Sequence, residues 1–148
     1  MTIWFDMDGT IADLYAVENW LPKLRAYDAS PYADAAPLLR LCDLARTLHK
    51  LQRAGYTIGI ISWLSKDPDP AYGEAVIAAK QVWLHQHLPS VRWDYIEISS
   101  YGTPKSIIAH IQPDDLLFDD EMQNIEEWEK AGGVGYFPEN IMEILRSL

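Results

Sequence analysis

Two carboxylates separated by one residue, Asp6 and Asp8, are the side chains of this sequence best placed for chemistry. They follow the apolar run 3–5, which predicts a short buried strand that stops at an Asp-Gly pair. Open α/β sheets bind their ligands at the C-terminal ends of their strands, where this pair falls. Gly9 provides a permissive backbone for the turn that follows. The pattern Asp-x-Asp-Gly-Thr therefore favours a ligand or catalytic site over a solvated surface turn.

Three further polar side chains fall at comparable points of the sequence. Ser62 and Asp119 each follow an apolar run, and Lys105 lies at the start of a predicted helix. Each has an ordinary alternative, since a serine can cap a strand, a lysine can be solvated, and an aspartate can begin a helix. A cation at a helix N-terminus opposes the helix dipole, so Lys105 gains nothing locally from its position. Because the C-terminal ends of parallel strands share one edge, we expect Ser62, Lys105 and Asp119 to meet Asp6 and Asp8 there.

Together these side chains could carry out phosphoryl transfer. Asp6 and Asp119 offer hard oxygen ligands to Mg²⁺, which prefers carboxylates, water and a substrate phosphate. Lys105 and the metal would offset the repulsion between an anionic phosphate and an anionic nucleophile. Ser62 would donate a hydrogen bond to a phosphate oxygen, and Asp6 would attack phosphorus to give an aspartyl-phosphate. Asp8 would protonate the leaving oxygen and later activate water.

Strand and helix patterns alternate along the whole chain. This alternation predicts an α/β fold in which helices cover both faces of a mainly parallel sheet. The segment 11–37 is mixed, because Trp20 and three prolines interrupt any long regular element, and we expect it to form a small cap. The predicted strands are 2–5, 56–61, 95–99, 116–118 and 134–137, and the predicted helices are about 38–51, 74–88, 104–110, 121–130 and 141–148.

Three details of the predicted helices bear on the site. Thr103-Pro104 is typical of an N-cap followed by proline at the first helical position. Asp120 is typical of a helix N-cap or first-turn acid, and Asp67 and Asp69 are typical of turns. The residues expected to face inward from helix 74–88 are Val76, Ala79, Val82 and Trp83.

Composition limits the classes of protein to consider. The 148 residues suit one domain, and 49% hydrophobic with 23% charged content is typical of a globular protein. The formal net charge of -10 disfavours binding to a nucleic-acid polymer, although one small phosphorylated ligand is compatible with it. A strand is predicted from Thr2, where a signal peptide would lie, and no apolar run is long enough for a transmembrane helix. Cys42 is the single cysteine, so no intrachain disulfide is expected. These features lead us to expect a cytoplasmic location.

The polar positions resemble the four motifs of the haloacid dehalogenase superfamily. The first motif is similar to Asp6–Thr10, the second to Ile60-Ile61-Ser62, the third to Lys105 and the fourth to Asp119-Asp120. The resemblance implies a Rossmann-like core, a Mg²⁺ ion, an aspartyl-phosphate intermediate and, in most members, phosphatase activity. It also implies that Asp8 ligates Mg²⁺ through its backbone carbonyl.

Within that superfamily, the stretch 62–124 is similar to the 5'(3')-deoxyribonucleotidases. The shared features are residues 74–83 with Lys80, Thr103-Pro104-Lys105, and residues 117–120 with Asn124. Segment 11–37 departs from the helical cap of those enzymes. The aromatic side chains that crowd it are expected to pack within the cap, although one or two could stack on a base or close over the site: Tyr15, Trp20, Tyr27 and Tyr32.

The sequence therefore predicts a Mg²⁺-dependent phosphomonoesterase acting on a nucleoside monophosphate or another small phosphorylated metabolite. Two alternatives remain open: a polynucleotide end phosphatase and a noncatalytic Mg²⁺-binding phosphoacceptor. A receiver-type phosphoacceptor places its aspartate after the third strand, where this chain has Ser99-Ser100. That position disfavours the noncatalytic reading.

Overall fold

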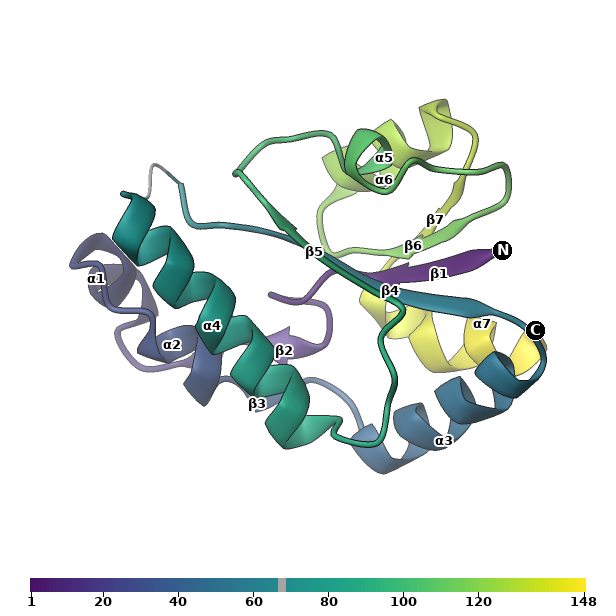
Figure 1. The fold of residues 1–148 in the computed structure, drawn as a ribbon, viewed down its shortest axis with the longest axis horizontal. Helices are drawn as coiled ribbons and strands as arrows, with labels where there is room; N and C mark the ends of the chain where they lie inside the picture. Colours follow the sequence, from purple (N-terminus) through teal and green to yellow (C-terminus); the bar gives the residue numbers. More distant parts are fainter. Residues whose placement is uncertain (67–68) are drawn as a thin grey trace.

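Five strands form one parallel sheet in the computed structural model, which describes residues 1–66 and 69–148 (Figure 1). The strand order is β5-β4-β1-β6-β7, so the first strand lies at the centre of the sheet. This arrangement confirms the predicted fold class. The strands are β1 (Thr2–Phe5), β4 (Thr57–Trp63), β5 (Tyr95–Ser99), β6 (Leu116–Phe118) and β7 (Val134–Tyr136).

Helices cover both faces of this sheet. On one face, Phe5 and Ile60 pack with Leu44 and Leu48 of α3 (Leu41–Arg53) and with α7 (Ile141–Ser147). On the other, Trp4 packs with Trp128 of α6 (Met122–Lys130), beside the short α5 (Lys105–Ile108). Figure 1 shows these two helical layers above and below the strands. The sheet is therefore buried at its centre, as the near-continuous apolar sequence of β4 predicts.

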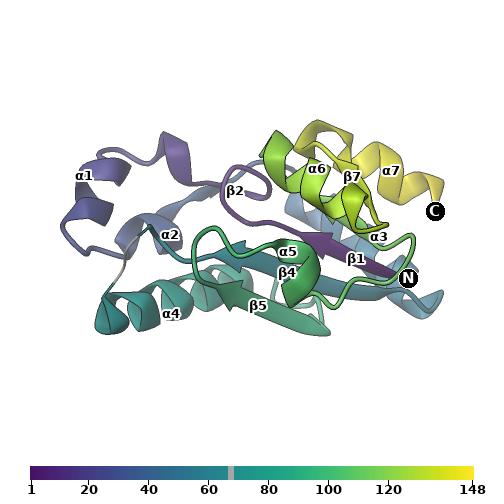
Figure 2. The ribbon, with the colours of Figure 1, turned by 90° about the horizontal axis from the view of Figure 1, so that it is seen from above.

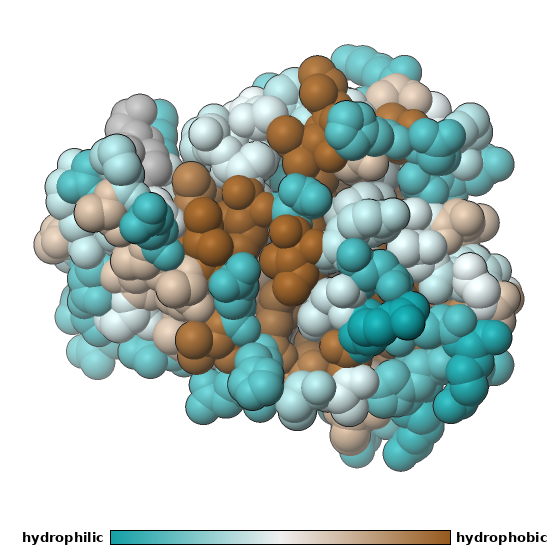
Figure 3. Space-filling model, viewed as in Figure 1, coloured by the Kyte–Doolittle hydropathy of each residue, from teal (hydrophilic) through white to brown (hydrophobic). Residues whose placement is uncertain are grey.

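Strand β5 forms one edge of the sheet and leaves apolar side chains at the surface. Ile96 of β5 is 38% exposed, and Ile107 of the nearby α5 is 64% exposed. Figure 3 shows apolar side chains along the middle of the face on which β5 lies. No helix of the described residues combines the length and the apolar character needed to cross a membrane.

Helix α4 (Pro70–His87) begins four residues earlier than the sequence pattern predicts. Asp69 acts as its N-cap, because its carboxylate accepts a hydrogen bond of 2.6 Å from the Tyr72 amide and Pro70 follows it. Asp69 is therefore a helix cap and not a simple turn residue, while Asp67 lies outside the described residues. The prediction that Val82 faces inward is wrong, since this side chain is 53% exposed. The buried face of α4 instead carries Tyr72, Gly73, Val76, Lys80, Trp83 and Leu84.

Segment 11–37, called the insert below, packs against α4. Leu14 and Tyr32 of the insert form an apolar cluster with Tyr72 and Val76. The Trp83 indole adds a hydrogen bond of 2.8 Å to the Ala35 carbonyl. Figure 2 shows the insert beside α4, at the end of the molecule away from the two termini. The elements of the insert are β2 (Ala12–Asp13), the 3-10 turn η1 (Leu14–Ala16), α1 (Trp20–Arg25), α2 (Ser30–Asp34) and β3 (Ala36–Pro37). Outside the insert, a second 3-10 turn, η2 (Pro138–Asn140), precedes α7.

Because Gly59 of β4 has no side chain, the ring of Trp4 can lie over this position on the face of the sheet. Its neighbours in register are Trp4 on one side and Tyr95 on the other. The Trp4 ring stacks on Tyr95 with 5.4 Å between the ring centroids, and a Cβ at position 59 would lie 2.5 Å from Trp4 Cε3. A side chain at this position would therefore displace the indole ring.

We expect Gly59→Ala to lower the free energy of unfolding by about 1–3 kcal/mol, because overpacking forces the Trp4 ring to move. The matched control is Gly73→Ala in α4, where the new Cβ would make an ordinary contact of 3.6 Å with Leu64. Alanine is the better helix former, so this control should gain roughly 0.5–1 kcal/mol. Urea denaturation measures both, and equal effects of the two substitutions would contradict the packing assigned to Trp4.

Candidate active site

A tight loop after β1 holds the first two aspartates. The Asp6 amide continues the sheet by donating to the Phe118 carbonyl at 2.9 Å. The Met7 carbonyl then accepts hydrogen bonds from the amides of residues 10, 11 and 12, which turns the chain sharply. Gly9 has φ +80°, and a Cβ there would collide with the Asp120 carboxylate. Glycine is therefore required at this position both for its backbone conformation and for the space it leaves.

Lys105 joins the carboxylates that follow the neighbouring strands β1 and β6. Its ammonium donates to Asp6 Oδ1 at 2.7 Å and to Asp119 Oδ2 at 2.6 Å. Burial opposes the charge on Lys105, but the carboxylates of Asp6 and Asp119 outweigh it and raise the pKa of the ammonium. Asp119 is fixed further by hydrogen bonds from the Asn124 side chain at 3.1 Å and the Glu121 amide at 2.9 Å. The lysine is thus a buried cation between two fixed anions.

The position of Lys105 differs in one respect from the sequence prediction. Helix α5 begins at Lys105 itself with Pro104 as its N-cap residue, so the expected cap at Thr103 is wrong. The Thr103 hydroxyl instead donates to the Ser100 carbonyl at 2.8 Å. The pairing of Lys105 with two carboxylates supplies the stabilisation that its place at a helix N-terminus does not.

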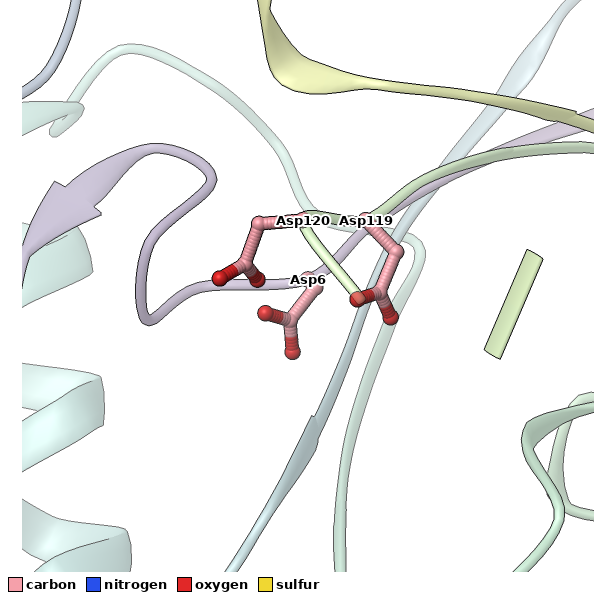
Figure 4. A group of neighbouring side chains, drawn as sticks. All are labelled: Asp6, Asp119 and Asp120. Carbon is pink, nitrogen blue, oxygen red and sulfur yellow. The ribbon is translucent and has the colours of Figure 1, made fainter. Parts of the chain in front are cut away.

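A third carboxylate, Asp120, completes an acidic cluster with Asp6 and Asp119. Oxygen atoms of the three side chains lie within 4.8 Å of one another, and Figure 4 shows them gathered at one place. Burial, followed by the charge of Asp6, raises the pKa of Asp119 to about 6. Burial, followed by the charges of Asp6 and Asp119, raises the pKa of Asp120 to about 7. The three carboxylates therefore place more negative charge in this buried site than the ammonium of Lys105, which pairs with Asp6 and Asp119, can offset.

This donor set fits a magnesium ion. Carboxylate oxygens are the ligands that Mg²⁺ prefers, and three of them converge here beside a solvent-accessible cavity. A divalent cation would favour the charged forms of Asp119 and Asp120 against the burial and the mutual repulsion that raise the pKa of both groups. Asp120 is not the N-cap expected from the sequence, because the capping position of α6 is Glu121.

The Asp8 side chain turns away from the acidic cluster to a second buried lysine. Lys80 donates to Asp8 Oδ2 at 2.8 Å and to Ser62 Oγ at 2.7 Å. Burial raises the pKa of Asp8, and the charge of Lys80 opposes this rise. The five predicted side chains thus divide into two groups: Lys105 joins Asp6 and Asp119, and Lys80 joins Asp8 and Ser62.

All five predicted side chains line one cavity of about 620 Å³ between the sheet edge and the insert. Two aromatic pairs form part of its wall. Tyr15 and Trp20 of the insert meet edge to face with ring centroids 5.1 Å apart. Trp63 and Tyr101 lie at the same centroid distance on the sheet side. The cavity therefore combines a charged floor with flat apolar walls.

The insert is joined to the cavity wall by hydrogen bonds as well as apolar packing. The Tyr32 hydroxyl lies 2.6 Å from Ser65 Oγ, which follows β4. Ser65 in turn lies 3.4 Å from the Tyr72 hydroxyl of α4. This chain of hydroxyl groups fixes the insert over the C-terminal edge of the sheet.

Comparison with known proteins yields structural matches alone. No protein-family model matches the sequence, and no curated protein gives a significant match. A D,D-heptose 1,7-bisphosphate phosphatase from Burkholderia thailandensis is 12% identical with a TM-score of 0.54, covering 99% of this chain and 96% of that one. A second such phosphatase, from B. bronchiseptica in complex with magnesium and phosphate, is 13% identical with a TM-score of 0.58, covering 92% and 79%. A hydrolase from Streptococcus pneumoniae is 14% identical with a TM-score of 0.58, covering 98% and 97%. The chain shares its fold with these proteins.

Sequence reasoning anticipated this meeting of side chains but missed the parts played by Lys80 and Asp120. Lys80 follows Val76 by four residues and precedes Leu84 by four, so helical spacing places it on the buried face of α4. A lysine at such a position was the available signal, because lysine is almost never fully buried unless it is paired. For Asp120 the signal was the fourth motif, Asp119-Asp120, although the sequence does not show which of two adjacent aspartates faces the site.

The raised pKa values of Asp119 and Asp120 predict how stability depends on pH. Between their ordinary value of 3.8 and the folded values of about 6 and about 7, the folded protein binds more protons than the unfolded chain. The metal-free protein should therefore become less stable as pH rises through this range. Magnesium needs ionised ligands, so its stabilising effect should grow over the same range.

Thermal denaturation from about pH 5 to pH 8, in EDTA and in Mg²⁺, tests this expectation. Asp120→Asn should flatten the pH dependence and weaken the Mg²⁺ effect, because one titrating ligand is gone. Asp114→Asn removes an exposed carboxylate outside the cavity and should behave like the wild type. An unchanged Mg²⁺ effect in Asp120→Asn would exclude this carboxylate from the metal site.

Proposed function

We propose that the protein hydrolyses phosphomonoesters in a Mg²⁺-dependent reaction through an aspartyl-phosphate on Asp6. The observation that carries the proposal is the setting of the Asp6 carboxylate. It is buried at the floor of an open cavity, Lys105 neutralises it in part, and two further carboxylates lie beside it. A nucleophile, charge compensation and metal ligands are thereby supplied within one cluster.

In the first step, an oxygen of Asp6 attacks the substrate phosphorus. A bond forms between this oxygen and phosphorus, and the bond from phosphorus to the alcohol oxygen breaks. Asp8 in its protonated form gives its proton to that leaving oxygen, which departs as the alcohol. Because its pKa is raised, Asp8 is protonated more often at a given pH than an ordinary aspartate is.

In the second step, water attacks the phosphorus of the aspartyl-phosphate. Asp8, now a carboxylate, takes a proton from that water, and the bond between phosphorus and the Asp6 oxygen breaks to release phosphate. Lys105 stays within hydrogen-bonding distance of the Asp6 carboxylate as it is regenerated. The same two aspartates thus serve both halves of the reaction.

The metal site is assigned to the side chains of Asp6 and Asp119, with the Asp8 carbonyl as the resemblance implies, and Asp120 is added from the geometry. Bound Mg²⁺ would lower the cost of bringing a phosphate dianion against an anionic nucleophile. Ser62 and Lys105 are the proposed donors to the phosphate oxygens. The neighbour from B. bronchiseptica is described with magnesium and phosphate, which is consistent with this assignment.

A nucleoside monophosphate is the substrate we propose. The Tyr15–Trp20 and Trp63–Tyr101 pairs offer flat apolar surfaces within reach of the phosphate end of the cavity. Stacking of a base on an aromatic side chain is worth roughly 1–3 kcal/mol. Two of the structural neighbours act on a heptose bisphosphate by their names, so a sugar phosphate is the competing class.

Asp6→Asn should abolish turnover, because it removes both the nucleophile and a metal ligand. We expect kcat to fall to below about 10⁻⁴ of the wild-type value, with the fold retained. EDTA should have a comparable effect on the wild type, reversed by Mg²⁺. A release assay for inorganic phosphate measures both, and Asp114→Asn serves as the matched control. Substantial turnover by Asp6→Asn, or in EDTA, would refute the mechanism.

The substrate proposal predicts a preference for nucleoside monophosphates over ribose 5-phosphate, measured as kcat/KM. Loss of one stacking surface in Trp20→Ala should cost about 5- to 150-fold on the nucleotide alone. Trp20 also packs against the apolar cluster of the insert, so Trp20→Leu is the second variant, which keeps apolar volume without an aromatic face. If the Trp20 variants lose as much kcat/KM on ribose 5-phosphate as on the nucleotide, Trp20 does not contact the base.

A further inference from the structure

Lys80 is a fully buried cation for which the reaction described above has no direct use. Its ammonium donates to three acceptors, which are Asp8 Oδ2 at 2.8 Å, Ser62 Oγ at 2.7 Å and the Trp63 carbonyl at 2.7 Å. A lysine ammonium has three protons, so each finds a partner. Lys80 therefore keeps no donor for a substrate phosphate, unlike a lysine that binds substrate directly.

The surroundings of Lys80 fix its ammonium in place. The residue belongs to the buried face of α4, and its side chain is 0% exposed. The ring of Tyr32 from the insert covers the ammonium, with 4.9 Å between Nζ and the ring centroid. Trp83, three residues along the same helix, holds the insert through its bond to the Ala35 carbonyl. The insert and α4 thus shield Lys80 from water.

The contact with Ser62 settles which way the serine hydroxyl can point. Because Ser62 Oγ accepts a hydrogen bond from Lys80, its own O–H must be directed elsewhere. Ser62 lines the cavity and the described residues offer no acceptor for its hydroxyl, so this donor is available to a phosphate oxygen that enters the cavity. Lys80 thereby converts a hydroxyl that could act either way into a donor.

The contact with Asp8 selects one carboxylate oxygen. Lys80 occupies Oδ2, whereas the described residues offer no hydrogen bond to Oδ1. Asp8 also lines the cavity. The oxygen free to exchange a proton with the leaving group or with water is therefore Oδ1. An aspartate without this anchor could rotate and present either oxygen or neither.

We propose that Lys80 is a positioning residue that orients both the Asp8 carboxylate and the Ser62 hydroxyl toward the substrate. The role rests on the proposed function, since it acts through the acid-base group and the phosphate donor of that reaction. It differs from the role of Lys105, which contacts the nucleophile. One side chain of α4 thus aligns two active-site groups, one in the loop after β1 and one near the end of β4.

The test is a pair of double-mutant cycles, which separate a shared action from two independent ones. Lys80→Met keeps the length of the side chain and removes all three donors. On a nucleoside monophosphate it should lower kcat at least about 30-fold in the wild-type background. In the Asp8→Asn background it should lower kcat less than about threefold, because the group it orients is already disabled.

The double variant also guards against misfolding. Lys80→Met alone leaves Asp8 without its buried partner, whereas Asp8→Asn with Lys80→Met leaves no unpaired charge. Lys50→Met, on the exposed surface of α3, removes one positive charge as a control and should leave kcat unchanged. A purely structural role would lower the melting temperature but give equal losses of kcat in both backgrounds. Equal losses, or a loss below about threefold in the wild-type background, would overturn the proposal.

The second cycle measures the binding of inorganic phosphate in Mg²⁺ by calorimetry, and it needs no turnover. Lys80→Met should weaken phosphate binding as much as Ser62→Ala does, and the two together should be no worse than either one. Additive losses would show that Lys80 does not act through Ser62. If the wild type hydrolyses no phosphate ester, the proposed function fails, and this cycle still decides whether Lys80 orients the serine.

Discussion

The bridge from Lys105 to Asp6 and Asp119 is the interaction on which the site depends. Phe5 and Phe118 are neighbours in register, so the residues that follow them must emerge side by side at the sheet edge. Both are aspartates, and bringing two buried carboxylates together is costly unless a cation lies between them. Lys105 reaches both at 2.6–2.7 Å from the connection between β5 and β6. The parallel sheet thus brings the charges of Asp6 and Asp119 together, and the connection between two of its strands carries the lysine that offsets their repulsion.

The second lysine extends the same principle to the other side of the cavity. Lys80 holds Asp8 and Ser62, and Tyr32 of the insert covers it. The charged floor and the insert are therefore linked through α4, whose first half packs on the insert and whose second half packs on the sheet. Such a link keeps the cavity preformed, so little reorganisation is needed when an anionic substrate enters.

The sequence predicts the residues near the ends of strands better than those on helices, although β4 runs two residues beyond its predicted end and so includes Ser62. Asp6, Ser62 and Asp119 could be placed because a parallel sheet collects its strand ends at one edge, whatever the packing elsewhere. Lys80 could not be given a role in the same way, since its partners lie 18 and 72 positions away along the chain. Val82 shows the same limit, because its apolar character suggests burial while the helix actually turns its other face inward. The start of α4 was missed because a proline-rich segment can open a helix as well as break one.

The central claim is that Asp6 becomes phosphorylated during turnover, and quenched-flow mass spectrometry tests it most directly. The wild type should be mixed with Mg²⁺ and a nucleoside monophosphate, quenched in acid within one turnover, and digested. The account predicts a transient phosphoryl group on the peptide that contains Asp6, located on that aspartate. Hydrolysis without any phosphorylated enzyme, or with the phosphoryl group on another residue, would contradict it.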